Sequence, residues 1–262
     1  MRVPDCVGAG CACVYAGRRG TSRENTDVIR DDSRSRILVS EPVALSWSGG
    51  KDSALALQHL RASGTHDVVA LLTSVTREYD RVSIHGVRRA LLHAQAAALG
   101  LPLVEVWLEP KSSDAAYQRA FLDGLDVLSD RHPAVNLMAF GDLYLRDVRD
   151  YRDRLLAGTP YRGLYPLWER PTRALADTFV ADGFEATIVC VDETQIDARF
   201  AGRRFDQALL AELPATADPC GENGEFHTFV HGGPIFSRPI AVQAGEVVRR
   251  EERFTYCDLV PG

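Results

Sequence analysis

The chain becomes regular at one segment, Val43-Ala44-Leu45-Ser46-Trp47-Ser48-Gly49-Gly50-Lys51-Asp52-Ser53. Its first five residues form a short, mostly apolar run of the kind that makes a buried strand, and the glycine pair closes the run with a tight turn. Ala54, Leu57 and Leu60 follow at helical spacing, and Gly64 stands where a helix ends in a left-handed residue. The segment predicts a buried strand joined by a Gly-rich loop to a helix.

This strand-then-helix unit repeats along the chain. Strands that alternate with helices pair in parallel, and right-handed crossovers place the helices on both faces of the sheet. The fold class is therefore predicted to be α/β, a Rossmann-like parallel sheet with the loop 48–53 at its ligand-binding carboxyl edge. The predicted segments are strands at 68–73, 103–108 and 135–140, and helices at 87–98 and 113–128.

The second half of the chain is less regular. A charged helix at 146–156, a strand at 164–167, a helix at 172–183 and a strand at 186–191 are expected first. Three β segments separated by Gly and Pro should follow, at 226–230, 235–242 and 247–256. We expect a flexible extension at 1–40, a domain carrying the Gly-rich loop at 41–145, and a smaller mixed α/β region at 146–262.

Composition excludes several classes of protein. The 262 residues are 45% hydrophobic and 25% charged, which is ordinary for a folded globular chain. The net charge of −6 argues against DNA as a partner, and no apolar run approaches the roughly 20 residues of a membrane span. A cytoplasmic protein is expected. The cysteines are too sparse for a disulfide scaffold, and Cys6, Cys11 and Cys13 lack a fourth metal ligand.

The residue types of the loop suit a polyphosphate. Two glycines allow backbone N–H groups to approach phosphate oxygens, and the helix N-terminus adds partial positive charge. Lys51 is one of only two lysines among 30 basic residues. Asp52 can cap the helix or bind Mg²⁺. The loop is not of the Walker A type, because Leu45 and Asp52 stand where that pattern needs Gly and Ser or Thr.

SGGKDS resembles the pyrophosphate-binding PP-loop of the N-type ATP pyrophosphatase superfamily. The resemblance implies an adenine nucleotide alpha hydrolase-like fold, ATP and Mg²⁺ as cofactors, and cleavage between the α and β phosphates. An acceptor oxygen is adenylated, pyrophosphate leaves, and a nucleophile displaces AMP. The residues implied to bind ATP are Ser48, Gly49, Gly50, Lys51, Asp52 and Ser53, with Asp52 also at the metal.

A second motif, Asp218-Pro219-Cys220-Gly221-Glu222-Asn223-Gly224-Glu225-Phe226-His227-Thr228-Phe229, resembles the C-terminal signature of the diphthine–ammonia ligase family. The usual signature is C-G-E-G-G-E-[FY]-E-T, so Asn223 and His227 are departures that leave the acceptor open. The chain looks like a bacterial-type relative. The resemblance implies a ligase that activates a carboxylate with ATP and couples it to ammonium or an amine. It implies Lys51, Glu222 and Glu225 as catalytic residues, and His85, Asp142, Asn223, His227 and Thr228 at the substrate.

Alternatives remain for the motif and for the function. Glu222 and Glu225 can hold or deprotonate ammonium or bind Mg²⁺, or they can simply decorate an exposed turn. Arg146, Arg149 and Asp150 fit a solvated helix face better than a site. Two other functions share the loop or the layout: a tRNA-modifying enzyme of thiolase or lysidine-synthetase type, and a non-enzymatic ATP sensor of universal-stress type. The acceptor, a protein or a small molecule, is not named by the sequence.

Overall fold

The structure is a computed structural model, and it describes residues 40–83 and 85–262. The predicted extension, apart from residue 40, and the cysteines Cys6, Cys11 and Cys13 lie outside the described residues. Within the described ranges, no helix is both long enough and apolar enough to cross a membrane.

The first sheet is built around two parallel central strands, β1 (Glu41–Ser46) and β2 (His66–Thr76). On one side β4 (Leu103–Leu108) pairs in parallel with β2, and on the other β5 (Leu137–Ala139) pairs in parallel with β1. The short β3 (Arg81–Val82) turns back antiparallel on the end of β2. The order β4-β2-β1-β5 places a reversal of strand order beside β1, where open α/β sheets bind ligands.

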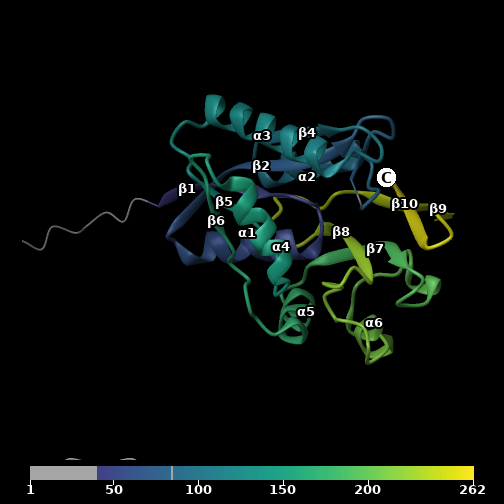
Figure 1. Cartoon of the computed structure of the whole chain (residues 1–262). Helices are drawn as coiled ribbons and strands as arrows, with labels where there is room; N and C mark the ends of the chain where they lie inside the picture. Colours follow the sequence, from purple (N-terminus) through teal and green to yellow (C-terminus); the bar gives the residue numbers. More distant parts are fainter. Residues whose placement is uncertain (1–39, 84) are drawn as a thin grey trace, which may run out of the picture. The chain divides into compact units, whose positions relative to one another are not determined.

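Alternating residues of the strands send side chains into two hydrophobic clusters. On one face, Val43 and Leu45 pack with α1 (Lys51–Ser63) and α2 (Arg89–Leu99). On the other face, Ala44 packs with α3 (Asp114–Arg131) and α4 (Arg146–Leu156). The predicted α/β sheet with helices on both faces is confirmed (Figure 1).

Helix ends follow the sequence signals. α1 and α2 both end at glycines in the left-handed conformation, Gly64 at φ 64° and Gly100 at φ 69°. Ser113 caps α3 through its side chain. The first sheet continues beyond residue 145, because β6 (Arg162–Leu164) pairs in parallel with β5. The domain boundary at 145 itself stays a prediction.

The second sheet is antiparallel and has the order β8-β7-β10-β9. It is preceded by α5 (Thr172–Ala181), and two short helices, η1 (Ala198–Phe200) and α6 (Gln207–Glu212), lie in the connection between β7 and β8. The strands are β7 (Glu185–Asp192), β8 (Phe226–Gly232), β9 (Val242–Arg250) and β10 (Phe254–Pro261). This smaller region matches the predicted one in character.

Three of the predicted strands are wrong: one is shifted along the chain, one is absent, and one is two strands. The strand expected at 164–167 lies at Arg162–Leu164, and 235–241 is not a strand, because turns around Gly233 and Pro234 prevent regular pairing. The segment 247–256 is two strands and not one. Its chain reverses at Glu251 and Glu252, both at φ 52°, a conformation that non-glycine residues rarely adopt. No glycine marks this turn, so the sequence did not reveal the hairpin.

Candidate functional site at the Gly-rich loop

The loop between β1 and α1 approaches its neighbours too closely for side chains at its glycines. Gly49 has φ 80°, and a Cβ there would lie 2.8 Å from Oε1 of Gln95. A Cβ on Gly50 would lie 3.1 Å from the carbonyl oxygen of Thr228. Ser53 Oγ donates to the Gly50 carbonyl at 2.8 Å and lies 3.3 Å from Ser48 Oγ. Gly49 is therefore required by its left-handed conformation and its close packing, and a side chain at Gly50 would need the backbone of β8 to shift by a few tenths of an ångström.

The loop is fastened to β8 of the second sheet. Thr228 Oγ1 accepts a hydrogen bond from the backbone N–H of Lys51 at 3.0 Å. The backbone N–H of Val230 donates to the Gly49 carbonyl at 2.9 Å. Thr228, predicted at the substrate, thus contacts the predicted nucleotide loop directly.

Lys51 is buried, with 2% of its surface exposed. Its ammonium donates to both carboxylate oxygens of Asp52, at 3.0 and 2.8 Å, and to the backbone carbonyl of Cys220. It also lies 5.6 Å from the ring centroid of Phe226. The first motif and the second, predicted separately, therefore meet at one ammonium group.

Glu222 reaches the segment that follows β5. Its carboxylate accepts hydrogen bonds from the backbone N–H groups of Leu143, at 2.8 Å, and Tyr144, at 3.4 Å. Burial raises the pKa of Glu222 to about 7, and the charge of Asp52 acts in the same direction. A carboxyl with this pKa gains and loses a proton near neutrality.

Glu225 is shielded and holds its own turn together. Only 1% of its surface is exposed. Its carboxylate accepts from the backbone N–H groups of Asp218, at 2.7 Å, and Asn223, at 3.0 Å, and from the Asn223 side chain at 3.0 Å. The Asn223 amide oxygen in turn accepts from the Tyr144 hydroxyl at 3.0 Å. Glu225 therefore shapes the turn that presents Glu222.

Two imidazole rings lie against each other beside the loop, tilted by 33°. The ring centroids of His85 and His227 lie 4.5 Å apart, and Cε1 of His85 is 3.2 Å from the place of a Cβ on Gly50. Burial lowers the pKa of His85 to about 4 and that of His227 well below its usual range, so both rings are neutral at pH 7. Nδ1 of His85 is buried without a hydrogen-bond partner among the described residues.

Asp142 lies near the loop but interacts with α4. Its carboxylate is 3.5 Å from Nε of Arg152, whose guanidinium covers the ring of Phe140. The preceding residue, Gly141, makes a close approach, because a Cβ there would lie 3.1 Å from the backbone nitrogen of Ser53. Arg146 is 81% exposed in its side chain, which fits the predicted solvated face.

Sequence reasoning missed Gln95. It is fully buried in α2, and its amide accepts from Trp47 Nε1 at 2.9 Å and donates to the carbonyls of Gly49 and Val230. Its position four residues after Leu91, on the apolar face of the helix, was the signal: a polar residue at a core position needs buried partners.

Cys220 does not have the features of a reactive cysteine. It is 1% exposed, and its thiol donates to the backbone carbonyl of Thr172 at 3.2 Å. Burial raises the pKa of the thiol, which is the opposite of what a persulfide-carrying cysteine needs. The structure therefore gives no support to the tRNA-thiolation alternative.

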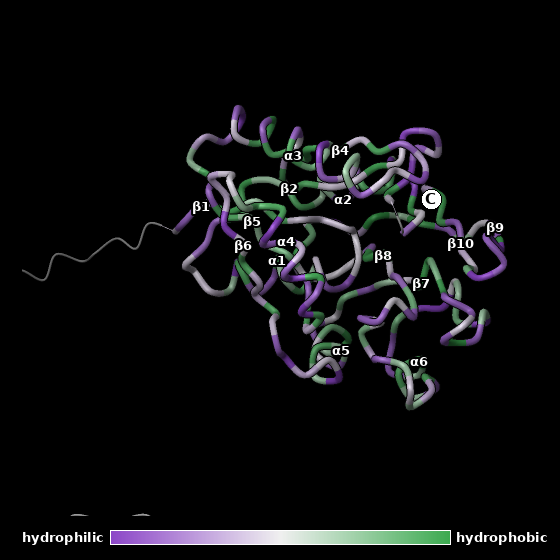
Figure 2. The backbone as a smooth tube through the Cα atoms, viewed as in Figure 1, coloured by the Kyte–Doolittle hydropathy of each residue, from purple (hydrophilic) through white to green (hydrophobic). Residues whose placement is uncertain are grey.

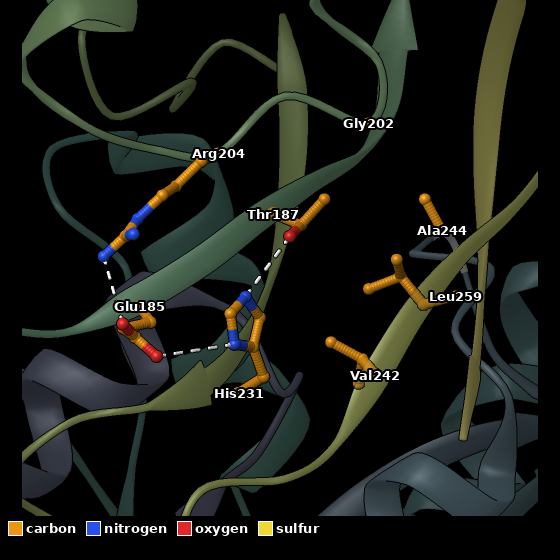
Figure 3. A pocket seen from close by; sticks show the side chains of 8 residues that line it. All are labelled: Glu185, Thr187, Gly202, Arg204, His231, Val242, Ala244 and Leu259. Carbon is orange, nitrogen blue, oxygen red and sulfur yellow. Dashed lines mark hydrogen bonds and ion pairs between the residues drawn. The ribbon is translucent and has the colours of Figure 1, made fainter. Parts of the chain in front are cut away.

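A separate cavity of about 280 Å³ lies in the second sheet (Figure 3). His231 lies there between Thr187 and Glu185. Its Nε2 is 3.3 Å from the Thr187 hydroxyl, and its Nδ1 is 4.0 Å from the Glu185 carboxylate. Arg204 pairs with the same Glu185 at 3.1 Å. The polar groups of this cavity are bonded to one another, and none of the predicted site residues lines it.

Residues that could hold a metal are few. The described residues contain no group of three or more His, Cys, Asp or Glu side chains placed to bind one. Asp52 offers a single carboxylate, now paired with Lys51. One carboxylate fits Mg²⁺ that is held mainly by phosphates and water, and does not fit an all-protein metal site.

The parallel sheet with a Gly-Gly-Lys loop at the carboxyl end of β1 defines a nucleotide-binding α/β protein of the PP-loop superfamily. Comparison with known sequences gives the family. The diphthamide synthase N-terminal domain matches residues 41–157, and the diphthamide synthase C-terminal domain matches residues 171–259. The chain belongs to the diphthine–ammonia ligase family.

Relatives named diphthine–ammonia ligase are identical to this chain at about a quarter of the aligned positions. The bovine protein is 27% identical and the human protein 26% identical, each over 227 residues that cover 79% of this chain and 84% of the relative. The Schizosaccharomyces pombe protein is 25% identical over 218 residues, 77% of this chain. The chain spans only 36% of that longer relative.

Proposed function

We propose that the chain is an ATP-dependent ligase, which adenylates a carboxylate and converts it to an amide with ammonia or an amine. AMP and pyrophosphate are the other products. The observation that carries the proposal is the meeting of the two motifs at Lys51, where the loop lysine contacts the Cys220 carbonyl and lies over Phe226. The names of the relatives support the same reaction class.

The loop would bind the pyrophosphate that leaves. Ser48, Ser53 and the N-terminus of α1 offer hydroxyl and backbone donors, and Gly49 and Gly50 bring the backbone close. Lys51 would exchange its contact with the Cys220 carbonyl for a phosphate oxygen. An ammonium in a buried site stabilises charge on a departing group far more than one in water.

Glu222 would take the proton of the nucleophile. In the first step a carboxylate oxygen attacks the α-phosphorus, and the bond to pyrophosphate breaks. In the second, ammonia attacks the carbonyl of the acyl adenylate, the C–N bond forms, and AMP leaves. A carboxylate with pKa about 7 accepts the proton that nitrogen loses. Glu225 would act in turnover by holding the turn, through its bonds to Asn223.

The remaining predicted residues would surround the acceptor. Beside the loop lie His85, His227 and Thr228. Asn223 belongs to the second motif, and Asp142 follows the end of β5. Mg²⁺, when bound with ATP, would neutralise phosphate charge, with Asp52 as its protein ligand. The relatives' names specify diphthine as the acceptor. Because Asn223 and His227 depart from the usual signature, we propose a carboxylate acceptor for this chain without naming the molecule.

The test is incubation of the full chain with ATP, Mg²⁺, ammonium and a fractionated lysate, with AMP as the readout. Wild-type chain should release AMP in response to a fraction that contains the acceptor. Lys51→Ala should abolish this release, while Arg131→Ala, at the exposed end of α3, should leave it unchanged. Normal AMP release by a folded Lys51→Ala chain would overturn the proposal.

A further inference from the structure

A cavity of about 590 Å³ lies at the carboxyl edge of the first sheet, away from the predicted motifs. It is lined by the ends of β2 and β3, by Lys111, three residues after the end of β4, and by the hairpin β9–β10. The volume is that of a small-molecule site. Residues that line it include Thr76, Arg81, Lys111, Arg250, Phe254 and Tyr256.

Two consecutive residues connect this cavity to the Gly-rich loop. Gly86 lines the cavity, and a Cβ on it would lie 2.9 Å from the ring of Tyr256. His85, directly before it, has its Cε1 3.2 Å from the place of a Cβ on Gly50. The segment 85–86 therefore contacts the cavity on one side and the loop on the other.

The cavity carries cations without partners. Lys111, the second of the two lysines, and Arg250 have no ion pair with any residue in 40–83 or 85–262. Arg81 is paired with Asp258, but that carboxylate also binds Arg88, at 2.6 Å. Glu251 also lines the cavity and has no ion pair within these ranges, so the charged side chains without a partner there are two cations and one carboxylate. The remaining surplus of one positive charge favours an anionic ligand.

The same cavity has flat apolar surfaces. Tyr79, which is 55% exposed, Phe254 and Tyr256 all line it. The hairpin tip beside them is strongly hydrophilic, as its purple colour shows (Figure 2). Aromatic rings next to unpaired cations suit a molecule with an apolar or aromatic body and anionic groups at its edge.

We propose that this cavity binds the body of the acceptor, a small-molecule acid that carries a second anionic group besides the reacting carboxylate. Lys111 and Arg250 hold the second anionic group, and the aromatic side chains cover the body. The reacting carboxylate then lies toward Gly50, where the nucleotide would be. This inference rests on the proposed ligase function, because it assigns the substrate of that reaction.

The first test uses 2,6-naphthalenedicarboxylate as the probe, titrated into the full chain without nucleotide by calorimetry. The diamide of the same acid is the neutral control. The diacid should bind, more weakly as salt rises, and Lys111→Gln with Arg250→Gln should weaken its binding about tenfold. Arg131→Gln should have no effect. Equal binding of the diamide, or no loss in the double variant, would refute the site.

Titration with a nonhydrolysable ATP analogue tests whether the cavity binds the acceptor or the nucleotide. The double variant should bind the analogue as wild type does, and saturating analogue should not displace the probe. Competition between the two would show that the cavity holds the nucleotide, and the inference would be wrong.

A second measurement separates this inference from the proposed function. The dialysable fraction of a lysate should drive AMP release by wild type, and the double variant should lose most of that release. AMP release driven only by the non-dialysable fraction, or release that is the same in the double variant, would reject the small-molecule acceptor and leave the ligase standing. Probe binding without AMP release from any fraction would reject the ligase instead.

Discussion

Thr228 Oγ1 accepts the backbone N–H of Lys51 at 3.0 Å, although 177 positions separate the two residues. The first N–H groups of an α-helix have no partner inside the helix, and Gly50, at the N-cap of α1, has no side chain to supply one. A hydroxyl from the second sheet supplies it instead. The conformation of the nucleotide loop therefore depends on the C-terminal region.

Thr228→Val should destabilise the chain and weaken nucleotide binding together. The substitution keeps the shape but leaves the Lys51 N–H without its acceptor, which costs about 1–2 kcal/mol in a buried position. Urea unfolding and titration with a nonhydrolysable ATP analogue measure the two effects.

Thr73→Val is the matched control for that substitution. Thr73 is 3% exposed, and its hydroxyl has no hydrogen-bond partner among the described residues. Removal of an unbonded buried hydroxyl should leave stability unchanged or raise it. If both variants lost the same stability, the hydroxyl of Thr228 would not be what fixes the loop.

Gln95→Leu should destabilise the chain by about 3 kcal/mol, because Trp47 Nε1 and the carbonyls of Gly49 and Val230 would all lose a buried partner. Tryptophan fluorescence during urea unfolding reads out both stability and the environment of Trp47. Gln58→Leu is the control, since the Gln58 amide bonds to Asp182 at the surface. A loss below 1 kcal/mol in Gln95→Leu would contradict the bridging role.

The regular half of the fold was predictable from sequence because its signals are local. Each of these signals can be recognised in a stretch of about ten residues: the buried strands, the apolar helix faces, and the glycines Gly64 and Gly100 that end two helices. The hairpin at Glu251 and Glu252 was not predictable, since its turn is formed by residues without turn preference. Its conformation is imposed by the pairing of β9 with β10.

In the candidate site, too, some features could be predicted from the sequence and others could not. The loop 48–53 and the motif 218–229 stand out as sequence patterns, and the structure brings Lys51 of one against Cys220 of the other. Gln95 and the Thr228–Lys51 bond depend on the packing of two sheets, which no local pattern encodes. The interaction of Asp142 with Arg152 has the same origin.

Glu222→Gln should change how stability depends on pH. The folded chain holds a proton on Glu222 up to about pH 7, whereas the unfolded chain loses it near the ordinary pKa of 4.5. The folded state therefore binds more protons between these values, and Glu222 makes stability fall as pH rises from about 4.5 to 7. Glutamine keeps the acceptor for the Leu143 N–H and removes the titration.

The measurement is the free energy of unfolding at pH 5 and pH 8 for both chains. Relative to wild type, Glu222→Gln should gain about 2 kcal/mol between the two pH values, an amount reduced by the partial exposure of the side chain. Glu225→Gln should instead be destabilised at both, because an amide nitrogen cannot accept the N–H groups that this carboxylate accepts. Parallel pH curves for Glu222→Gln and wild type would rule out the raised pKa.

Lys51→Met should destabilise the chain, and Asp52→Asn should partly restore it. Lys51 is buried and its ammonium pairs with Asp52 at 2.8 Å, so methionine leaves a carboxylate without its cation. Breaking a buried pair from one side costs about 3–5 kcal/mol, and less here because the Asp52 side chain is 29% exposed. Neutralising Asp52 in the Lys51→Met background removes the unpaired charge, so the double variant should be more stable than Lys51→Met alone.

The control Lys111→Met, at an exposed lysine, should change the free energy of unfolding by less than about 0.5 kcal/mol. Because the restored fold still lacks the ammonium, the double variant should remain without AMP release, which separates the structural role of Lys51 from its role at the phosphates.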